Sequence, residues 1–177
     1  MPAFDTQPSL VDDRVRLRPL READRPAVRA AAADPLTWQQ HNDTGRYGPS
    51  FERYFEDNLA SGGGLAIEDA RSGEVIGLTR LQLLTGVDDA VEVGWTFLRR
   101  DRWGTGDNRS AKRLLVDYAA THGRRVLLFI YEHNLRSRRA AEKLGGRLVG
   151  EGDPTGWLPT KPARVVYVLP QRLAPSE

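Results

Sequence analysis

The sequence predicts a single α/β domain, of the α+β kind, built on one mixed β-sheet. Its 177 residues suffice for one substantial core, and 40% hydrophobic with 28% charged residues is typical of a globular chain. Segments with strand periodicity and segments with helix periodicity follow one another in the order βααβββαβαββ. Between residues 90 and 131 a strand, an amphipathic helix and an apolar strand succeed one another, which predicts a parallel pair joined by a right-handed crossover.

Each element is predicted from the spacing of its apolar residues and from the residues that stop it. Val15 and Leu17 alternate with arginines until Pro19 ends a half-buried strand. The expected elements are a strand at 15–18, helices at 21–33 and 51–59, strands at 65–69, 75–84 and 90–98, a helix at 108–122, a strand at 126–131, a helix from the cap residue Asn134 to Lys143, and strands at 147–149 and 164–169.

The remaining segments are expected to be irregular. We predict a flexible N-terminal arm at residues 1–12, the domain itself at residues 13–170 and a frayed tail at residues 171–177. Residues 37–49 are polar and predict a mobile loop, and residues 152–162 are rich in glycine and proline.

Two elements carry more detailed expectations. The helix at 108–122 is capped by Asp107 or Asn108 and ended by Gly123, and its apolar stripe comprises Ala111, Leu114, Leu115, Tyr118 and Ala119. Strict alternation in the strand at 90–98 places Val91, Val93, Trp95 and Phe97 on one face and Glu92, Gly94 and Thr96 on the other. The second face, with one carboxylate and small residues, suits the floor of a groove; a plain solvent-facing row is the alternative.

Composition excludes several classes of function. A net charge of +2 argues against a dedicated nucleic-acid binder. The absence of cysteine removes disulfides, a thiolate nucleophile and zinc–thiolate sites, and no metal site is expected. No apolar run has transmembrane length and the N-terminus lacks a signal pattern, so we expect a cytoplasmic protein without membrane contact.

The segment from Trp95 to Asn108 carries the most information about chemistry. A strand runs into a basic loop with Gly104 and Gly106, and that loop opens a helix whose first N–H groups lack intrahelical partners. Such a helix start binds phosphate or pyrophosphate. Six basic and two acidic side chains lie between Arg99 and Arg113, and a solvated helix face is the alternative explanation for them. The run is neither a mononucleotide P-loop nor a dinucleotide fingerprint.

Two motifs resemble those of a known family. Glu92-Val93-Gly94-Trp95 followed by Trp103-Gly104-Thr105-Gly106-Asp107-Asn108-Arg109-Ser110-Ala111-Lys112 is similar to the acyl-CoA-binding motif of GNAT N-acetyltransferases, in the branch with the ribosomal-protein N-terminal acetyltransferases. The run from Asn134 to Gly145 resembles the second family signature. The resemblance covers roughly residues 13–169. It implies a mostly antiparallel central sheet, a parallel strand pair splayed around an acyl-CoA cleft, and helices on both faces.

The resemblance also implies acetyl-CoA as cosubstrate. Its pyrophosphate is expected on the backbone amides of Trp103 to Asn108 and its pantetheine arm beside Phe97 and Leu98. The pantetheine end is expected at Asn134 and Ser137. Some, but not all, of the arginines Arg99, Arg100, Arg102 and Arg109 are expected to meet phosphates. The implied binding residues are Phe97, Leu98, Arg99, Arg102, Trp103, Gly104, Thr105, Gly106, Asp107, Asn108, Arg109, Asn134 and Ser137.

Catalytic roles are expected for two side chains. Glu92 is the candidate general base, acting through a water, and the alternative is a carboxylate that only pins a neighbouring segment. Backbone amides near Val93 to Trp95 are the implied oxyanion donors. Ser137 is the candidate partner of the departing thiolate, and the alternative is a bond to its own helix's first turn. The chain departs from the family at Ala141, where many relatives have a tyrosine acid, and at Asp107, Asn108 and Gly146.

Histidines and aromatic residues add weaker candidates. His133 and His41 lie near the expected cleft, and His122 is explained by a helix C-terminus. The aromatic residues that could line an acceptor pocket are Trp38, Tyr47, Phe51, Tyr54 and Trp157, with a core role favoured for Phe51 and Tyr54.

The function expected from these residues is acetyl transfer from acetyl-CoA to a primary amine, a protein N-terminus or a small amine, directly within a ternary complex. The first alternative is a non-catalytic CoA-binding or interaction protein on the same fold. A weaker alternative is an RNA- or ribosome-associated basic protein, which the low net charge disfavours. The expected partners are an acyl-CoA and an amine acceptor, and the chain is expected to be a monomer or a homodimer.

Overall fold

The structure, a computed structural model, describes residues 4–149 and 164–173. Its elements are β1 (Leu10–Val11), β2 (Val15–Pro19), η1 (Glu22–Asp24), α1 (Arg25–Ala32), η2 (Pro35–Trp38), α2 (Phe51–Ala60), β3 (Gly64–Asp69), β4 (Val75–Leu84), β5 (Val87–Leu98), η3 (Arg100–Arg102), α3 (Asp107–Thr121), β6 (Arg125–Tyr131), α4 (Leu135–Lys143), β7 (Arg147–Val149) and β8 (Arg164–Val168).

One sheet in the order β1-β2-β3-β4-β5-β6-β8-β7 organises the described residues. The pair β5–β6 is parallel, and each other neighbouring pair in this order is antiparallel. The helix α3 connects the two parallel strands, as the sequence predicted. The predicted mixed, mostly antiparallel sheet is therefore confirmed.

The parallel pairing is short, and this shapes the centre of the molecule. It starts at Ala90 with Arg125 and ends at Glu92 with Leu127. β5 continues to Leu98 and β6 to Tyr131 without pairing to each other, so the strands separate beyond Glu92. This separation is the splayed pair that the sequence predicted.

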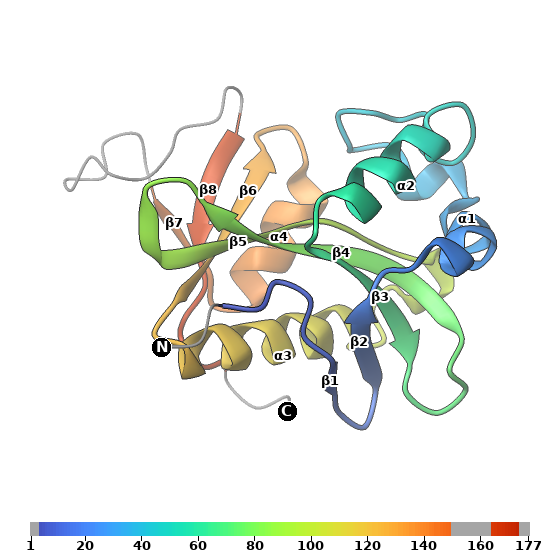
Figure 1. The fold of residues 1–177 in the computed structure, drawn as a ribbon. Coiled ribbons are helices and arrows are strands. Elements are labelled where there is room, and N and C mark those ends of the chain that lie inside the picture. The colour runs from blue at the N-terminus through green and yellow to red at the C-terminus, as the bar shows by residue number, and fades with distance from the viewer. Residues whose placement is uncertain (1–3, 150–163, 174–177) are drawn as a thin grey trace.

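Helices cover both faces of the sheet, with α2 on one side and α3 on the other in Figure 1. α1 and α2 bury Val28, Phe51 and Phe55 in a core that also takes Leu78 from the sheet. The opposite face forms a second core with buried residues of α3 and with Ala141 of α4. Burial of both faces explains the nearly continuous apolar run of β6.

A β-bulge in β5 corrects the predicted alternation of its side chains. Arg80 of β4 pairs with Gly94 and Leu78 pairs with Phe97, so β5 holds one extra residue between these pairs. At the bulge Trp95 has φ of 52°. Val91 and Val93 pack with α3, whereas Trp95 and Phe97 pack with α1 and α2. The prediction that these four residues share a face is wrong, because the extra residue reverses the alternation beyond it.

Three further segments differ from the prediction. The helix expected at 21–33 is the short η1 followed by α1, which has a proline in its first turn. The segment expected to form a polar loop from residue 37 begins within η2, where Trp38 is fully buried and its indole N–H donates to the carbonyl of Ala32 at 2.8 Å. β1 is an edge strand paired with β2, within the stretch predicted as an arm.

Candidate functional site

The glycine loop at residues 103–106 leads directly into α3. Gly104 and Gly106 have φ of 78° and 96°, a region that favours glycine. Gly106 is the N-cap of α3 and has no side chain to cap it, while the N–H of Asp107 donates to the hydroxyl of Thr105 at 3.4 Å. The expectation that Asp107 or Asn108 caps this helix is therefore wrong: the helix already begins at Asp107, because left-handed glycine turns the chain straight into it.

The loop presents main-chain donors at the start of a 15-residue helix. Within the described chain, the backbone N–H groups of Gly104, Thr105, Gly106 and Asn108 donate to no protein acceptor. The N–H of Trp103 instead donates to the carbonyl of Arg100 at 3.1 Å. Unoccupied donors at a helix N-terminus, where the helix dipole is positive, form a site that suits an anion of phosphate type.

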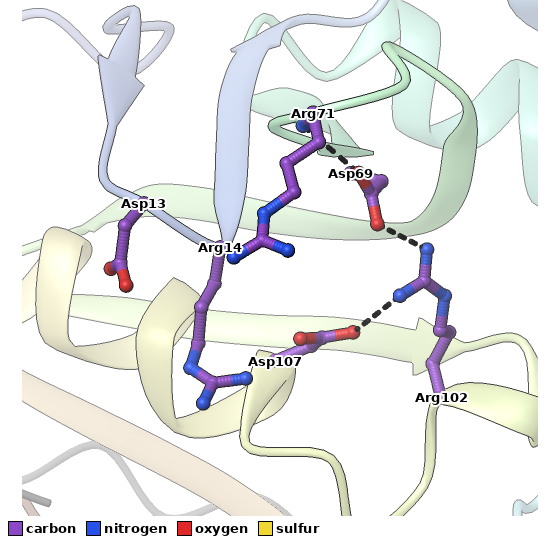
Figure 2. A pocket seen from close by; sticks show the side chains of 6 residues that line it. All are labelled: Asp13, Arg14, Asp69, Arg71, Arg102 and Asp107. Carbon is purple, nitrogen blue, oxygen red and sulfur yellow. Dashed lines mark hydrogen bonds and ion pairs between the residues drawn. The ribbon is translucent and has the colours of Figure 1, made fainter.

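A network of ion pairs lies next to this loop, and Figure 2 shows the network around a small pocket. Arg102 pairs with Asp69 and, at 3.5 Å, with Asp107, whose side chain is 5% exposed. Arg14 donates to the carbonyl oxygen of Thr105 at 2.9 Å. The buried carboxylate of Asp107 thus faces Arg102, which explains how an aspartate is tolerated beside an anion site.

Asp69 holds this network to the sheet. The backbone N–H groups of Ser72 and Arg71 donate to one of its oxygens at 3.0 and 2.9 Å, and Arg102 binds the other. These donors, with that of Ser72 the largest contribution, lower the pKa of Asp69 below its usual value. Asp69 is therefore an anion that fixes Arg102 at neutral pH.

The predicted phosphate ligands among the arginines have partners within the chain. Arg99 donates to Glu74 and to Asp101, Arg109 donates to the carbonyl of Lys143 at 3.2 Å, and Arg100 lies 3.8 Å from Asp34. Together with Arg102, these side chains hold the surroundings of the loop. Their contact with phosphate stays a prediction, and the main-chain donors are the stronger candidates.

The residues expected beside the pantetheine arm lie at the end of β5. Phe97 and Leu98 are buried in the cores on opposite faces of the sheet. Trp103 donates its indole N–H to the carbonyl of Leu98 at 3.0 Å, which anchors the loop to the strand. Phe97 and Leu98 are therefore the end of β5 to which the loop is attached, and their contact with a cosubstrate stays a prediction.

The N-terminus of α4 is capped as predicted. The side-chain oxygen of Asn134 accepts from the N–H of Ser137 at 3.0 Å. The hydroxyl of Ser137 makes no hydrogen bond to the described residues, so the alternative bond to its own first turn is not formed. Ser137 is half-buried, and its role toward a thiolate stays a prediction.

Arg136 connects α4 to the other side of the site, a link that no sequence signal indicated. Its backbone N–H donates to the side chain of Gln40 at 2.8 Å, and its guanidinium donates to the carbonyl of Thr37 at 2.6 Å. The guanidinium also lies 4.3 Å from the ring centre of Trp103. The glycine loop, η2 and the start of α4 thereby meet at one side chain.

Glu92 lies just before the bulge, where β5 and β6 separate. Its side chain is buried, with the residue 2% exposed, and alternation directs it away from Val91 and Val93. It stabilises the charge of Arg80, whose guanidinium lies 4.1 Å from the ring centre of Trp95. The phenol of Tyr54 donates to the carbonyl of Trp95 at 2.5 Å. A carboxylate and a strained, well-held backbone segment are thus adjacent.

The remaining candidates from the sequence occupy simpler positions. Burial and the nearby Arg46 and Arg136 lower the pKa of His41 to about 3, so it is neutral at physiological pH. His133 and His122 are exposed, and His122 contacts the carbonyl of Tyr118 at the end of α3. Trp38, Phe51 and Tyr54 are core residues, and Tyr47 is exposed. Trp157 and the loop at 152–162 lie outside the described residues.

A buried lysine beneath the bulge was missed by the sequence analysis. Lys112 of α3 is 6% exposed and donates from Nζ to the hydroxyl of Thr96 at 2.7 Å. Burial lowers its pKa from 10.5 to about 7. The predicted stripe of α3 put Leu114 and Tyr118 inside, whereas the structure leaves both only partly buried and buries Lys112 and Val116.

This lysine makes stability depend on pH in a defined direction. Between pH 7 and 10.5 the unfolded chain holds a proton on Lys112 that the folded chain has released, so the free energy of unfolding rises with pH. Relative to Lys112→Met, the native chain should gain stability with a slope approaching ~1.4 kcal/mol per pH unit in this window. Urea unfolding of both proteins at pH 7, 8 and 9 measures the slope. If the free energies of unfolding of the two proteins changed equally with pH, the shifted pKa would be contradicted.

Among the described residues, no helix is long and apolar enough to span a membrane. No group of three or more histidine, aspartate or glutamate side chains is placed to hold a metal ion in the same part of the chain.

Comparison with known proteins identifies the family. The family model described as an acetyltransferase (GNAT) domain matches residues 14–147. Comparison with curated proteins gave no match.

Solved structures agree with this match. An acetyltransferase from Agrobacterium tumefaciens str. C58 is 27% identical and has a TM-score of 0.66, and the match covers 91% of this chain and 93% of that protein's chain. A GCN5-related N-acetyltransferase from Brucella melitensis has a TM-score of 0.72 at 20% identity, with coverages of 93% and 79%. RimJ of Mycobacterium smegmatis, solved with CoA-disulfide, has a TM-score of 0.63 at 19% identity, with coverages of 92% and 85%. With the family model spanning most of its length, the chain belongs to the GNAT acetyltransferase family.

Proposed function

We propose that this chain transfers an acetyl group from acetyl-CoA to a primary amine, directly within a ternary complex. The observation that carries the proposal is the glycine loop, whose N–H groups at Gly104, Thr105, Gly106 and Asn108 have no acceptor within the described chain. These donors fit the diphosphate of coenzyme A, because a diphosphate offers several anionic oxygens to converging amides. The loop lies at the end of β5, beside the separated strand pair.

The protein's own groups then divide the chemistry. Glu92 removes a proton from the acceptor ammonium, through a water, so that a neutral amine attacks. Main-chain N–H groups at the β5 bulge donate to the thioester carbonyl oxygen as it gains negative charge. The hydroxyl of Ser137, at the start of α4, donates a hydrogen bond to the departing sulfur. Cysteine is absent from the chain, which agrees with direct transfer.

One feature favours the alternative of a CoA-binding protein without activity. Ala141 of α4, at the position where many relatives have a tyrosine that acts as an acid, is 1% exposed and packs in the hydrophobic core that α3 and α4 form with the sheet. No phenol can protonate the thiolate from this position, so Ser137 or water must suffice.

A turnover screen separates the two functions. Acetyl-CoA is incubated with the protein and a panel of amines and N-terminal peptides, with released thiol as the signal and CoA affinity measured by calorimetry. We expect thiol release at least ~100-fold above the amine-only rate for one acceptor class, an increase equivalent to about 2.7 kcal/mol of barrier. Tight CoA binding with no transfer to any amine would instead establish the non-catalytic alternative.

A further inference from the structure

Lys112 is a buried amino group without an acidic partner. It lies in the second turn of α3 and contacts the sheet directly beneath the bulge of β5. Its hydrogen-bond partner among the described residues is the hydroxyl of Thr96, at 2.7 Å, and no carboxylate of this part of the chain lies within ion-pair distance of Nζ. Burying a lysine in this way is costly, because its amino group must either lose the hydration of its charge or give up its proton. An apolar residue would pack here at lower cost.

Thr96 links Lys112 to the bulge through its hydroxyl. Its hydroxyl oxygen lies 2.8 Å from that of Thr79, and it can donate to the carbonyl oxygen of Gly94 at 3.2 Å. Thr79 is fully buried and lies 3.5 Å from the same carbonyl. With its oxygen accepting from Lys112, the hydroxyl of Thr96 is oriented to donate to one of these two oxygens.

The opposite face of the bulge is held as well. Tyr54 of α2 donates to the carbonyl of Trp95 at 2.5 Å, from the side of the sheet away from α3. Two successive carbonyls, of Gly94 and Trp95, are thus fixed from opposite faces. Between these two carbonyls lie the N–H and Cα of Trp95, a non-glycine residue at positive φ. This conformation persists only where its surroundings impose it.

We propose that Lys112 is a positioning residue which, through Thr96, holds the β5 bulge so that its main-chain N–H groups stay aimed at the thioester carbonyl. This inference rests on the proposed function. Lys112 itself touches neither cosubstrate nor acceptor and acts only through Thr96. A purely structural lysine would instead be expected to contribute to folding, and its loss would lower stability and activity together.

The variants Lys112→Met and Thr96→Val test the proposal. Methionine keeps the length of the lysine stem and valine keeps the shape of threonine, and each removes the polar contact. Thr96→Ser keeps the hydroxyl, and Lys143→Met removes an exposed lysine of α4 as the matched control. Each protein is assayed for kcat and KM with the acceptor found in the screen, for CoA affinity, for melting temperature, and for amide hydrogen exchange of the peptide spanning residues 92–98.

We expect kcat to fall about 10- to 100-fold in Lys112→Met and in Thr96→Val, with KM for acetyl-CoA and CoA affinity within about threefold of the native values. The double variant should be no slower than the single ones, because both remove one contact. Amides of the 92–98 peptide should exchange faster, the melting temperature of Lys112→Met should not fall, and Thr96→Ser and Lys143→Met should behave as the native chain does.

Unchanged kcat with unchanged exchange in both variants overturns the proposal. So does a joint loss of melting temperature, CoA affinity and kcat in both, since that pattern reports a structural role. If Lys112→Met does not fold, Thr96→Val decides. If the native chain binds CoA and acetylates nothing, the proposed function fails separately, and hydrogen exchange alone then decides whether Lys112 holds the bulge.

Discussion

Gly106→Trp is expected to weaken CoA binding at least ~100-fold, equivalent to about 2.7 kcal/mol, while the protein stays folded. Gly106 has φ of 96°, a conformation in which any other residue is strained, and its N–H is one of the free donors of the loop. A β-carbon there would lie 3.6 Å from the guanidinium of Arg14, an ordinary contact. The substitution therefore acts by displacing the loop backbone and by filling the anion site with an indole.

Calorimetry with CoA and with pantetheine measures this effect. Pantetheine lacks the diphosphate, so its weak binding should change little while that of CoA is lost. The control is Gly86→Trp in the turn between β4 and β5, where φ is 75° and no atom lies within 4 Å of an added β-carbon. It imposes the same kind of backbone strain away from the loop. Native CoA affinity in Gly106→Trp, or equal loss in Gly86→Trp, would reject the assignment of the loop.

Glu92→Gln is expected to slow acetyl transfer about 100-fold near pH 7, with the deficit shrinking as the pH rises. The glutamine keeps the shape of a residue that is 2% exposed but cannot accept a proton. An acceptor α-amine titrates near ~8 and a lysine-like amine near ~10.4, so above these values the amine is already neutral and needs no base. The largest loss should therefore occur at low pH.

The pH profile of kcat/KM from pH 6 to 10 tests this role. Glu68→Gln is the matched control, because Glu68 is also a buried carboxylate of the sheet. It pairs with Arg18 and lies on β3, which in the strand order is separated from β6 by β4 and β5. It should cost stability and leave the shape of the pH profile unchanged. A ratio of native to Glu92→Gln rates that is constant with pH would show that Glu92 has a structural role, and an unchanged rate would clear it of any role.

Local sequence patterns were sufficient for the elements and for the loop. The parallel pair joined by α3 followed from a strand, an amphipathic helix and an apolar strand in succession, and the structure confirms it. Gly104 and Gly106 indicated a loop that opens a helix, and the structure places α3 directly after them. The cap at Asn134 was also predicted correctly. These features depend on neighbouring residues, which sequence spacing records.

The features that the sequence analysis got wrong or left incomplete depend on partners distant in the chain. The bulge at Trp95 arises from the register with β4, and an extra residue leaves no trace in a count of alternating residues. The arginines around the loop were predicted from local charge density as candidates for phosphate. The structure adds that Glu74 and Asp69, brought near by the β3–β4 hairpin, pair with Arg99 and Arg102, and the contact of these arginines with phosphate stays a prediction.

By itself, then, the sequence determined the order of strands and helices and the presence of a glycine loop at the start of a helix, because hydrophobic periodicity and glycine placement are local properties. Only the tertiary structure decided which donors of that loop remain open, which face of β5 carries Phe97, and that Lys112 is buried against Thr96. Each of these depends on which side chains and carbonyls from other elements occupy the surrounding space, and that is settled by packing and strand register.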